Sequence, residues 1–145
     1  LRVTIIGDVN HSRVVPSQIQ LLNMFSCEDI NFLGPKSLIS DKFKPAFNSA
    51  SESCLSERDI LFILRVQKER FKNNDTINED KFIKDFQVNE NFIQRTGFKG
   101  YLMHPGPMNL GAEITESTAS AKNSLILEQV ENGLYSRAAL LSLIA

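Results

Sequence analysis

Cysteine is scarce in this sequence, and neither sign of charge dominates. The 145 residues include two cysteines, Cys27 and Cys54, which are too few for a disulfide framework and lack the spacing of metal ligands. The 16 basic and 17 acidic side chains give a net charge of -1. This balance argues against nucleic acid as an obligate partner, because phosphate binding needs a basic face. The sequence contains no run of about 20 apolar residues, so it predicts no membrane span. A reducing cytoplasm is the expected location.

Several motifs of enzyme chemistry are also missing. The sequence contains no G-x-S-x-G, P-loop, C-x-x-C or H-E-x-x-H motif, and no G-x-G-x-x-G follows a strand. His104 has no second imidazole or cysteine at a suitable spacing, so we expect no metal site. If this chain takes part in catalysis, the chemistry must rest on positioning and charge stabilisation, without a covalent intermediate.

Short apolar runs that recur along the chain predict four strands. They lie at 3–6, 30–33, 60–64 and 100–103. Strands that alternate with helices imply a parallel sheet with right-handed crossovers. The length favours a single domain over residues 1–145. We therefore expect an α/β fold, a three-layer, Rossmann-like sandwich in which helices flank a mainly parallel sheet. The first run begins at the chain start without an initiator methionine, which suggests a piece of a longer polypeptide.

Helix signals lie between and after these runs. Ser12 is placed to cap a helix after the first strand, with Pro16 in its first turn. A second helix begins at Thr76 or Asn78 and ends near residue 86. From about Ala121 onward, apolar residues recur at spacings of three and four, which predicts a long final helix.

Polar sequences follow the first and third predicted strands, where parallel sheets bind ligands. Arg13 comes early in the first predicted helix, and its guanidinium offers a planar fork of donors to a carboxylate or phosphate. A salt bridge to a surface acid is the simpler interpretation of Arg13. For Asp8, the simpler interpretation is that it fixes the turn and has no further role. Arg65 ends a purely apolar strand and needs a partner, while Gln67 faces the same side in an extended segment. A solvated charge cluster remains the alternative for these two residues.

The fourth predicted strand ends in a stiff His-Pro-Gly-Pro segment. Its carbonyl groups are not used in a sheet ladder, and Pro107 is a candidate for a cis peptide bond. The segment is either part of a site or a structural turn. If it is part of a site, the three strand ends converge, and two arginines on one edge suggest a small ligand with two anionic groups.

Three segments together resemble the catalytic chain of the aspartate carbamoyltransferases. They are 7–14, with Gly-Asp and His-Ser-Arg-Val, 64–70, Leu-Arg-Val-Gln-Lys-Glu-Arg, and 104–109, His-Pro-Gly-Pro-Met-Asn. Residues 132–141 resemble the final helix of that family. The resemblance runs along nearly the whole chain, but it covers only the C-terminal, aspartate-binding half of the family's subunit.

The resemblance implies a substrate and a role for each site residue. Arg13 and Arg65 would bind the two carboxylates of L-aspartate, and Gln67 would contact or orient the same molecule. Backbone groups of Gly106 and Pro107 would touch carbamoyl phosphate. The two remaining candidates, Glu69 and His104, would orient the site, with Glu69 holding Arg65. In the family, the aspartate amine attacks the carbamoyl carbon and phosphate leaves through a tetrahedral intermediate, without a metal or organic cofactor.

The resemblance also implies what this chain lacks. The family's phosphate-binding motif, its catalytic histidine and its neighbour-subunit loop belong to an N-terminal, carbamoyl-phosphate-binding domain that is absent here. We therefore expect the isolated domain to be inactive and its final helix to expose an apolar patch. The full-length chains would form a homotrimer for pyrimidine synthesis, with regulatory or dihydroorotase partners left open. Leu110 stands where many bacterial relatives carry arginine, which puts an ion pair at that position in doubt.

Two alternatives to aspartate carbamoylation remain open. An ornithine carbamoyltransferase should carry an H-C-L-P segment, whereas Pro105 and Gly106 stand there in this chain. Arginines that face the substrate also disfavour cationic ornithine. A homologue without catalytic activity that binds an anion or a partner is the other possibility, against which the intact arginines and glutamine argue.

Overall fold

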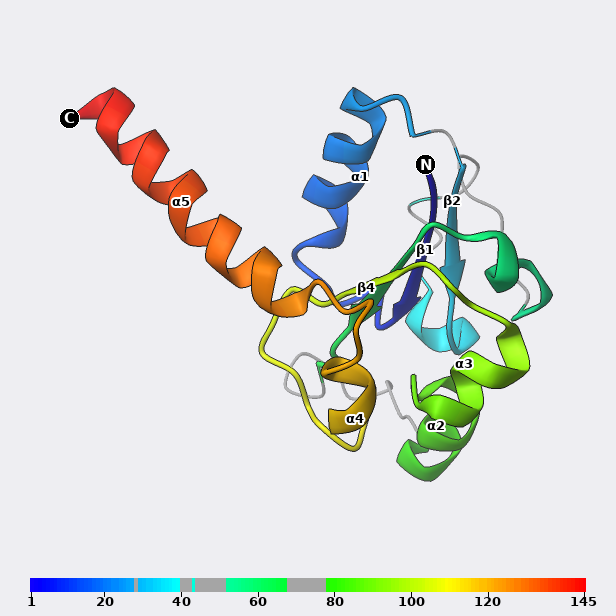
Figure 1. The fold of residues 1–145 in the computed structure, drawn as a ribbon. Helices are drawn as coiled ribbons and strands as arrows, with labels where there is room; N and C mark the ends of the chain where they lie inside the picture. Colours follow the sequence, from blue (N-terminus) through cyan, green and yellow to red (C-terminus); the bar gives the residue numbers. More distant parts are fainter. Residues whose placement is uncertain (28, 40–42, 44–51, 68–77) are drawn as a thin grey trace.

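Four parallel strands form the centre of the molecule (Figure 1). The computed structural model describes residues 1–27, 29–39, 43, 52–67 and 78–145. The strands are β1 (Arg2–Gly7), β2 (Asp29–Leu33), β3 (Ile60–Leu64) and β4 (Tyr101–Met103). Their order is β2-β1-β3-β4, and each neighbouring pair is parallel. The predicted strands and the parallel sheet are confirmed.

Alternate side chains of the strands are buried on opposite faces of the sheet, as a two-residue period requires. On one face, Ile5 of β1 packs with Ile19 of helix α1 (Val15–Met24). On the other face, Ile6 and Ile63 pack with Phe92 of helix α3 (Glu90–Thr96). Helices thus cover both faces, and the expected three-layer α/β architecture is confirmed.

The other elements surround this sandwich. They are the 3-10 helices η1 (Lys36–Leu38) and η3 (Glu52–Glu57) and the helices α2 (Glu79–Phe86), α4 (Glu116–Ala119) and α5 (Ile126–Ile144). Helix α2 begins as predicted at Asn78, whose side-chain oxygen accepts the backbone N–H of Lys81 at 2.9 Å. Among the described residues, no helix is long and apolar enough to cross a lipid bilayer.

Helix α1 begins later than the sequence predicts. Pro16 lies in its first turn as expected, but the N-cap residue is Val14 and no side chain caps the helix. The prediction that Ser12 caps it is wrong, because the chain first makes a turn after β1 and Ser12 stands before the cap position. Arg13 consequently belongs to the loop before the helix and not, as predicted, to the helix itself.

Helix α5 also begins later, at Ile126 instead of about Ala121. The preceding residues run beside β4 and hydrogen-bond to it. The backbone N–H of Leu102 donates to the carbonyl of Asn123, and the N–H of Leu125 donates to the carbonyl of Leu102, each at 2.9 Å. These groups are therefore not available for helical hydrogen bonds.

The greater part of α5 projects away from the sheet (Figure 1). Apolar side chains along it are largely exposed, with exposed fractions of 76% for Leu127, 57% for Val130, 58% for Leu134 and 62% for Leu141. The predicted apolar patch on the final helix is confirmed.

Candidate functional site

A cavity of about 260 Å³ lies at the carboxyl edge of the sheet. It is lined by Ser12, Arg13, Val14, Leu64, Arg65, Gln67, Pro105, Gly106 and Pro107. The lining comes from the end of β3 and from the three segments that follow β1, β3 and β4. The structure thus brings five of the predicted site residues to one space.

The register of the sheet explains why these segments meet. Gly7 at the end of β1 pairs with Leu64 at the end of β3, so the polar segments that follow start side by side. A β-carbon on Gly7 would lie 2.6 Å from the carbonyl oxygen of Leu64, and the φ of Gly7 is +113°. Glycine is required there both for its backbone conformation and for this close approach.

The two arginines reach the cavity in different ways. Arg13 is exposed, and among the described residues no carboxylate forms an ion pair with it, so the predicted surface salt bridge is not observed in that part of the chain. Arg65 is half-buried at the end of β3. Gln67 faces the same cavity, while Val66 between them is buried against Leu38 and Phe82. The predicted alternation after β3 is confirmed.

Gln67 carries a second indication of a ligand site. Its amide oxygen is buried and has no hydrogen-bond partner among the residues that the structure describes. Buried polar atoms are normally hydrogen-bonded, so each exception requires an explanation. A hydrogen-bond donor on a ligand in the cavity would supply the missing partner.

A buried carboxylate connects the two arginine-bearing segments. Asp8 is 0% exposed, and its Oδ1 accepts the backbone N–H of His11 at 3.1 Å and lies 2.9 Å from the ring Nδ1 of His11. Its Oδ2 accepts the backbone N–H of Gln67 at 3.1 Å. Asp8 therefore does more than fix a turn, because it holds the loop of Arg13 and the segment of Gln67 together.

The His-Pro-Gly-Pro segment forms the third wall. Its Gly106–Pro107 peptide bond is cis, as predicted. His104 does not line the cavity. It is 0% exposed, and its Nδ1 accepts the backbone N–H of Gly106 at 2.9 Å. Gly106 has a φ of +66°, a left-handed conformation that favours glycine. Glu69, the remaining predicted orienting residue, lies outside the described residues.

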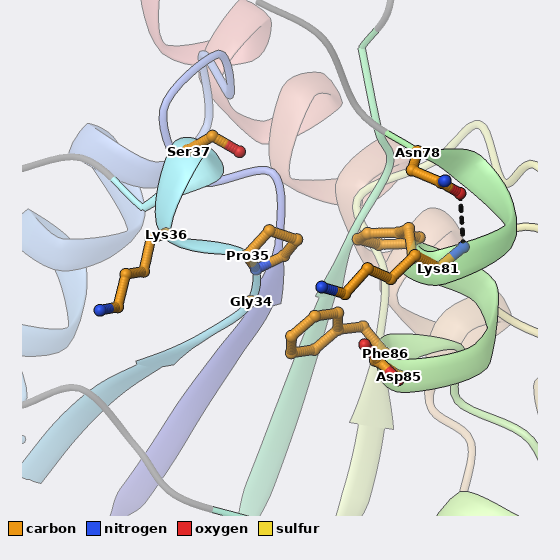
Figure 2. A pocket seen from close by; sticks show the side chains of 9 residues that line it. Gly34, Pro35, Lys36, Ser37, Asn78, Lys81, Asp85 and Phe86 are labelled. Carbon is orange, nitrogen blue, oxygen red and sulfur yellow. Dashed lines mark hydrogen bonds between the residues drawn. The ribbon is translucent and has the colours of Figure 1, made fainter.

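A larger cavity of about 420 Å³ lies between the segment after β2 and helix α2 (Figure 2). Its lining includes Pro35, Phe86, Lys36 and Lys81 but none of the predicted site residues. Figure 2 shows the amine of Lys81 directed into the space near Pro35, whereas the side chain of Lys36 points away. A single ammonium with Asp85 nearby offers no planar fork, so the smaller cavity fits a ligand with two anionic groups better.

Comparison with known proteins gives a family match and solved structures of similar fold. A family model described as "Aspartate/ornithine carbamoyltransferase, Asp/Orn binding domain" matches residues 1–144. The chain is similar to a Trypanosoma cruzi aspartate transcarbamoylase solved with carbamoyl aspartate and phosphate, with a TM-score of 0.81, 22% identity, and coverage of 97% of this chain and 48% of that one. It is also similar to the catalytic subunit of M. jannaschii aspartate transcarbamoylase, with a TM-score of 0.78, 23% identity, and coverage of 97% and 48%. The chain thus spans about half the length of these structures.

Proposed function

Because the chain belongs to the aspartate/ornithine carbamoyltransferase family, as its match to the Asp/Orn binding domain shows, we propose that it is the L-aspartate-binding half of an aspartate carbamoyltransferase. The enzyme would transfer the carbamoyl group of carbamoyl phosphate to the amine of L-aspartate. The products would be N-carbamoyl-L-aspartate, for pyrimidine biosynthesis, and phosphate. The observation that carries this proposal is the single cavity lined by Arg13, Arg65 and Gln67.

The charges of this cavity suit a dicarboxylate. Each guanidinium can bind one carboxylate with two parallel hydrogen bonds. The unpartnered amide oxygen of Gln67 can accept a hydrogen bond from the substrate amine. With both carboxylates held, the amine is the part of aspartate left to react.

Carbamoyl phosphate would lie against the third wall. Gly106 already donates its N–H to His104, and Pro107 has no N–H. The two residues can therefore offer only carbonyl oxygens, which suit the NH₂ group of the carbamoyl moiety. This hydrogen-bond accounting supports the roles proposed for Gly106 and Pro107.

The reaction needs no nucleophile from this chain. The substrate amine attacks the carbamoyl carbon and a tetrahedral intermediate forms. Phosphate then leaves with the electrons of its bond to that carbon and takes up the proton that the amine nitrogen loses. Holding the amine and the carbamoyl carbon in contact gains rate by orientation, and nearby cations stabilise the charge that develops. Glu69 would support this arrangement by holding Arg65.

The phosphate group must be bound mainly by residues outside this chain. Because the chain spans about half of the structures it resembles, we propose that a carbamoyl-phosphate-binding domain completes the site and that this half alone is inactive. Full-length chains are proposed to form a homotrimer. Cys27 and Cys54 form no disulfide, which suits the reducing cytoplasm that we propose as the location.

The described lining of the cavity also bears on the ornithine alternative. It includes two arginines and no carboxylate. The cationic side chain of ornithine would face like charge there, at a cost in binding free energy. Aspartate is therefore the substrate that we favour.

The test is a carbamoyl-transfer assay with the full-length protein. We expect N-carbamoyl-aspartate, detected by mass spectrometry, when carbamoyl phosphate and L-aspartate are supplied, and no citrulline when ornithine replaces aspartate. A larger kcat/KM for ornithine than for aspartate would overturn the proposal. Product formation by residues 1–145 alone at the full rate would contradict the need for a second domain.

A further inference from the structure

A pair of buried ionisable side chains lies behind the cavity wall, outside the lining residues. His104 and Glu113 are 0% and 1% exposed. The ring Nε2 of His104 lies 3.3 Å from Oε1 of Glu113, in close contact but without the alignment of a hydrogen bond.

The hydrogen bond at the other ring nitrogen determines the tautomer of His104. Nδ1 accepts the N–H of Gly106 and so carries no proton. The ring proton is therefore on Nε2, directed towards Glu113. The ring connects the backbone of Gly106 on one side with the carboxylate on the other.

Glu113 also holds the far end of the same segment. Its Oε1 accepts the backbone N–H of Asn109 at 2.6 Å, while its Oε2 is buried with no hydrogen-bond partner among the described residues. Burying a carboxylate costs free energy, and a partly satisfied one costs more than an apolar side chain would. A purely structural turn has no need of such a group.

We propose that Glu113 is a positioning residue that fixes the Gly106–Pro107 turn through His104. The carboxylate orients the imidazole, the imidazole keeps the N–H of Gly106 turned away from the cavity, and the carbonyl groups of Gly106 and Pro107 face the carbamoyl group. Glu113 itself touches no substrate. The kinetic part of this inference rests on the proposed function, whereas the fixed turn does not.

A further contact supports the same arrangement. The side-chain amide of Gln129, in α5, donates to the carbonyl of His104 at 3.0 Å. His104 is thus held at its ring and at its backbone, and the turn that follows it has little freedom.

The test compares Glu113→Gln with Gln87→Met in the full-length protein. Gln87 provides a matched control, because its amide donates to the carbonyl of Gly111 at 2.5 Å and so supports the 109–113 turn without touching His104. Glu113→Gln keeps the shape but removes the charge. We expect its KM for carbamoyl phosphate to rise about tenfold while its KM for aspartate changes less than about twofold. Gln87→Met should lower the melting temperature and leave both KM values within about twofold.

A second readout needs no activity. Amide hydrogen exchange at Gly106 should be about tenfold faster in Glu113→Gln and unchanged in Gln87→Met. In the double variant Glu113→Gln/His104→Gln, the KM for carbamoyl phosphate should rise no further than in His104→Gln, because the acid acts through the ring. Equal effects of Glu113→Gln and Gln87→Met on both KM values and on exchange would overturn the inference.

Failure of the two proposals can be told apart. A full-length protein without carbamoyl-transfer activity would reject the proposed function, and the exchange at Gly106 would then decide alone whether Glu113 fixes the turn. Should Glu113→Gln fail to fold, Glu113→Asp serves in its place. Its shorter carboxylate cannot reach both partners, so the same rise in the exchange rate is expected, and unchanged exchange would overturn the inference.

Discussion

At the scale of single residues, the shape of the arginine side chain matters as much as its charge. A guanidinium presents parallel N–H groups that match both oxygens of a carboxylate, whereas an ammonium is a point charge. Arg65 brings this group to the end of an otherwise apolar strand, within a cavity that Arg13 also lines. The proposed binding of a dicarboxylate depends on both guanidinium groups.

Arg65→Lys should therefore weaken aspartate binding while keeping the charge. If the proposed function holds, loss of the bidentate geometry, about 2 kcal/mol, corresponds to an aspartate KM raised about 30-fold in the full-length protein. Arg95→Lys is the control, because Arg95 makes a bidentate pair with Glu52 at 3.0 Å and 3.0 Å but does not line the cavity. An unchanged aspartate KM in Arg65→Lys would remove Arg65 from the site.

Asp8→Asn tests the connection between the two arginine-bearing segments. The asparagine side chain has one acceptor oxygen in place of two, so it cannot accept the backbone N–H groups of both His11 and Gln67 in the same way. The two segments that line the cavity should then be held less firmly. We expect the aspartate KM to rise about fivefold. Asp59→Asn is the matched control. Its carboxylate accepts the backbone N–H of Arg2 at 2.7 Å, at the opposite end of β1, and the substitution should leave the KM unchanged. Equal KM values in the two variants would contradict the role of Asp8.

The pH dependence of stability should reflect Asp59. The hydrogen bond from the backbone N–H of Arg2 lowers the pKa of Asp59 below its ordinary value. A carboxyl group whose pKa is lower in the folded state stabilises the fold above its unfolded pKa of about 3.9, and this contribution is lost as the pH falls through the lowered value. Urea denaturation should show Asp59→Asn less stable than the wild type at neutral pH, with the difference disappearing in strong acid. A difference that grows on acidification would contradict this assignment.

At the scale of secondary structure elements, the sheet was predictable and the helix boundaries were less so. The strands are marked by local apolar runs such as Ile60–Leu64, which matches β3 at both ends. The starts of α1 and α5 depend on contacts made in the folded chain. The hydrogen bonds between β4 and the residues around Asn123 link positions that the local spacing of apolar residues does not connect. The two short helices α3 and α4 were not predicted.

The exposed face of α5 makes its own prediction. Leu134 is 58% exposed, so a charged side chain there disturbs nothing within the described residues. If further polypeptide of the full-length protein covers this face, Leu134→Glu should destabilise that protein by about 2 kcal/mol. Thermal unfolding measures this effect, with Ser136→Glu on a different face of the helix as the control. Equal melting temperatures for the two variants would mean that the apolar face stays uncovered.

At the scale of the whole molecule, the sequence predicted which segments converge but not how they are held. Arg13, Arg65, Gln67, Gly106 and Pro107 line one cavity because parallel strands end at one edge of the sheet. The hydrogen bond from Gln67 to Asp8 and the contact of His104 with Glu113 were missed. The first joins residues that are distant in sequence, and the second depends on exact side-chain placement. Neither leaves a periodic signal in the sequence. The acid that follows the His-Pro-Gly-Pro segment was the one available clue to Glu113.

The most direct test of the dicarboxylate site is inhibition by succinate, which has both carboxylates of aspartate but lacks the amine. In steady-state assays of the full-length protein, succinate should compete with aspartate. Its inhibition should be lost in both Arg13→Ala and Arg65→Ala. Inhibition that survives both substitutions, or succinate that does not compete with aspartate, would contradict the account.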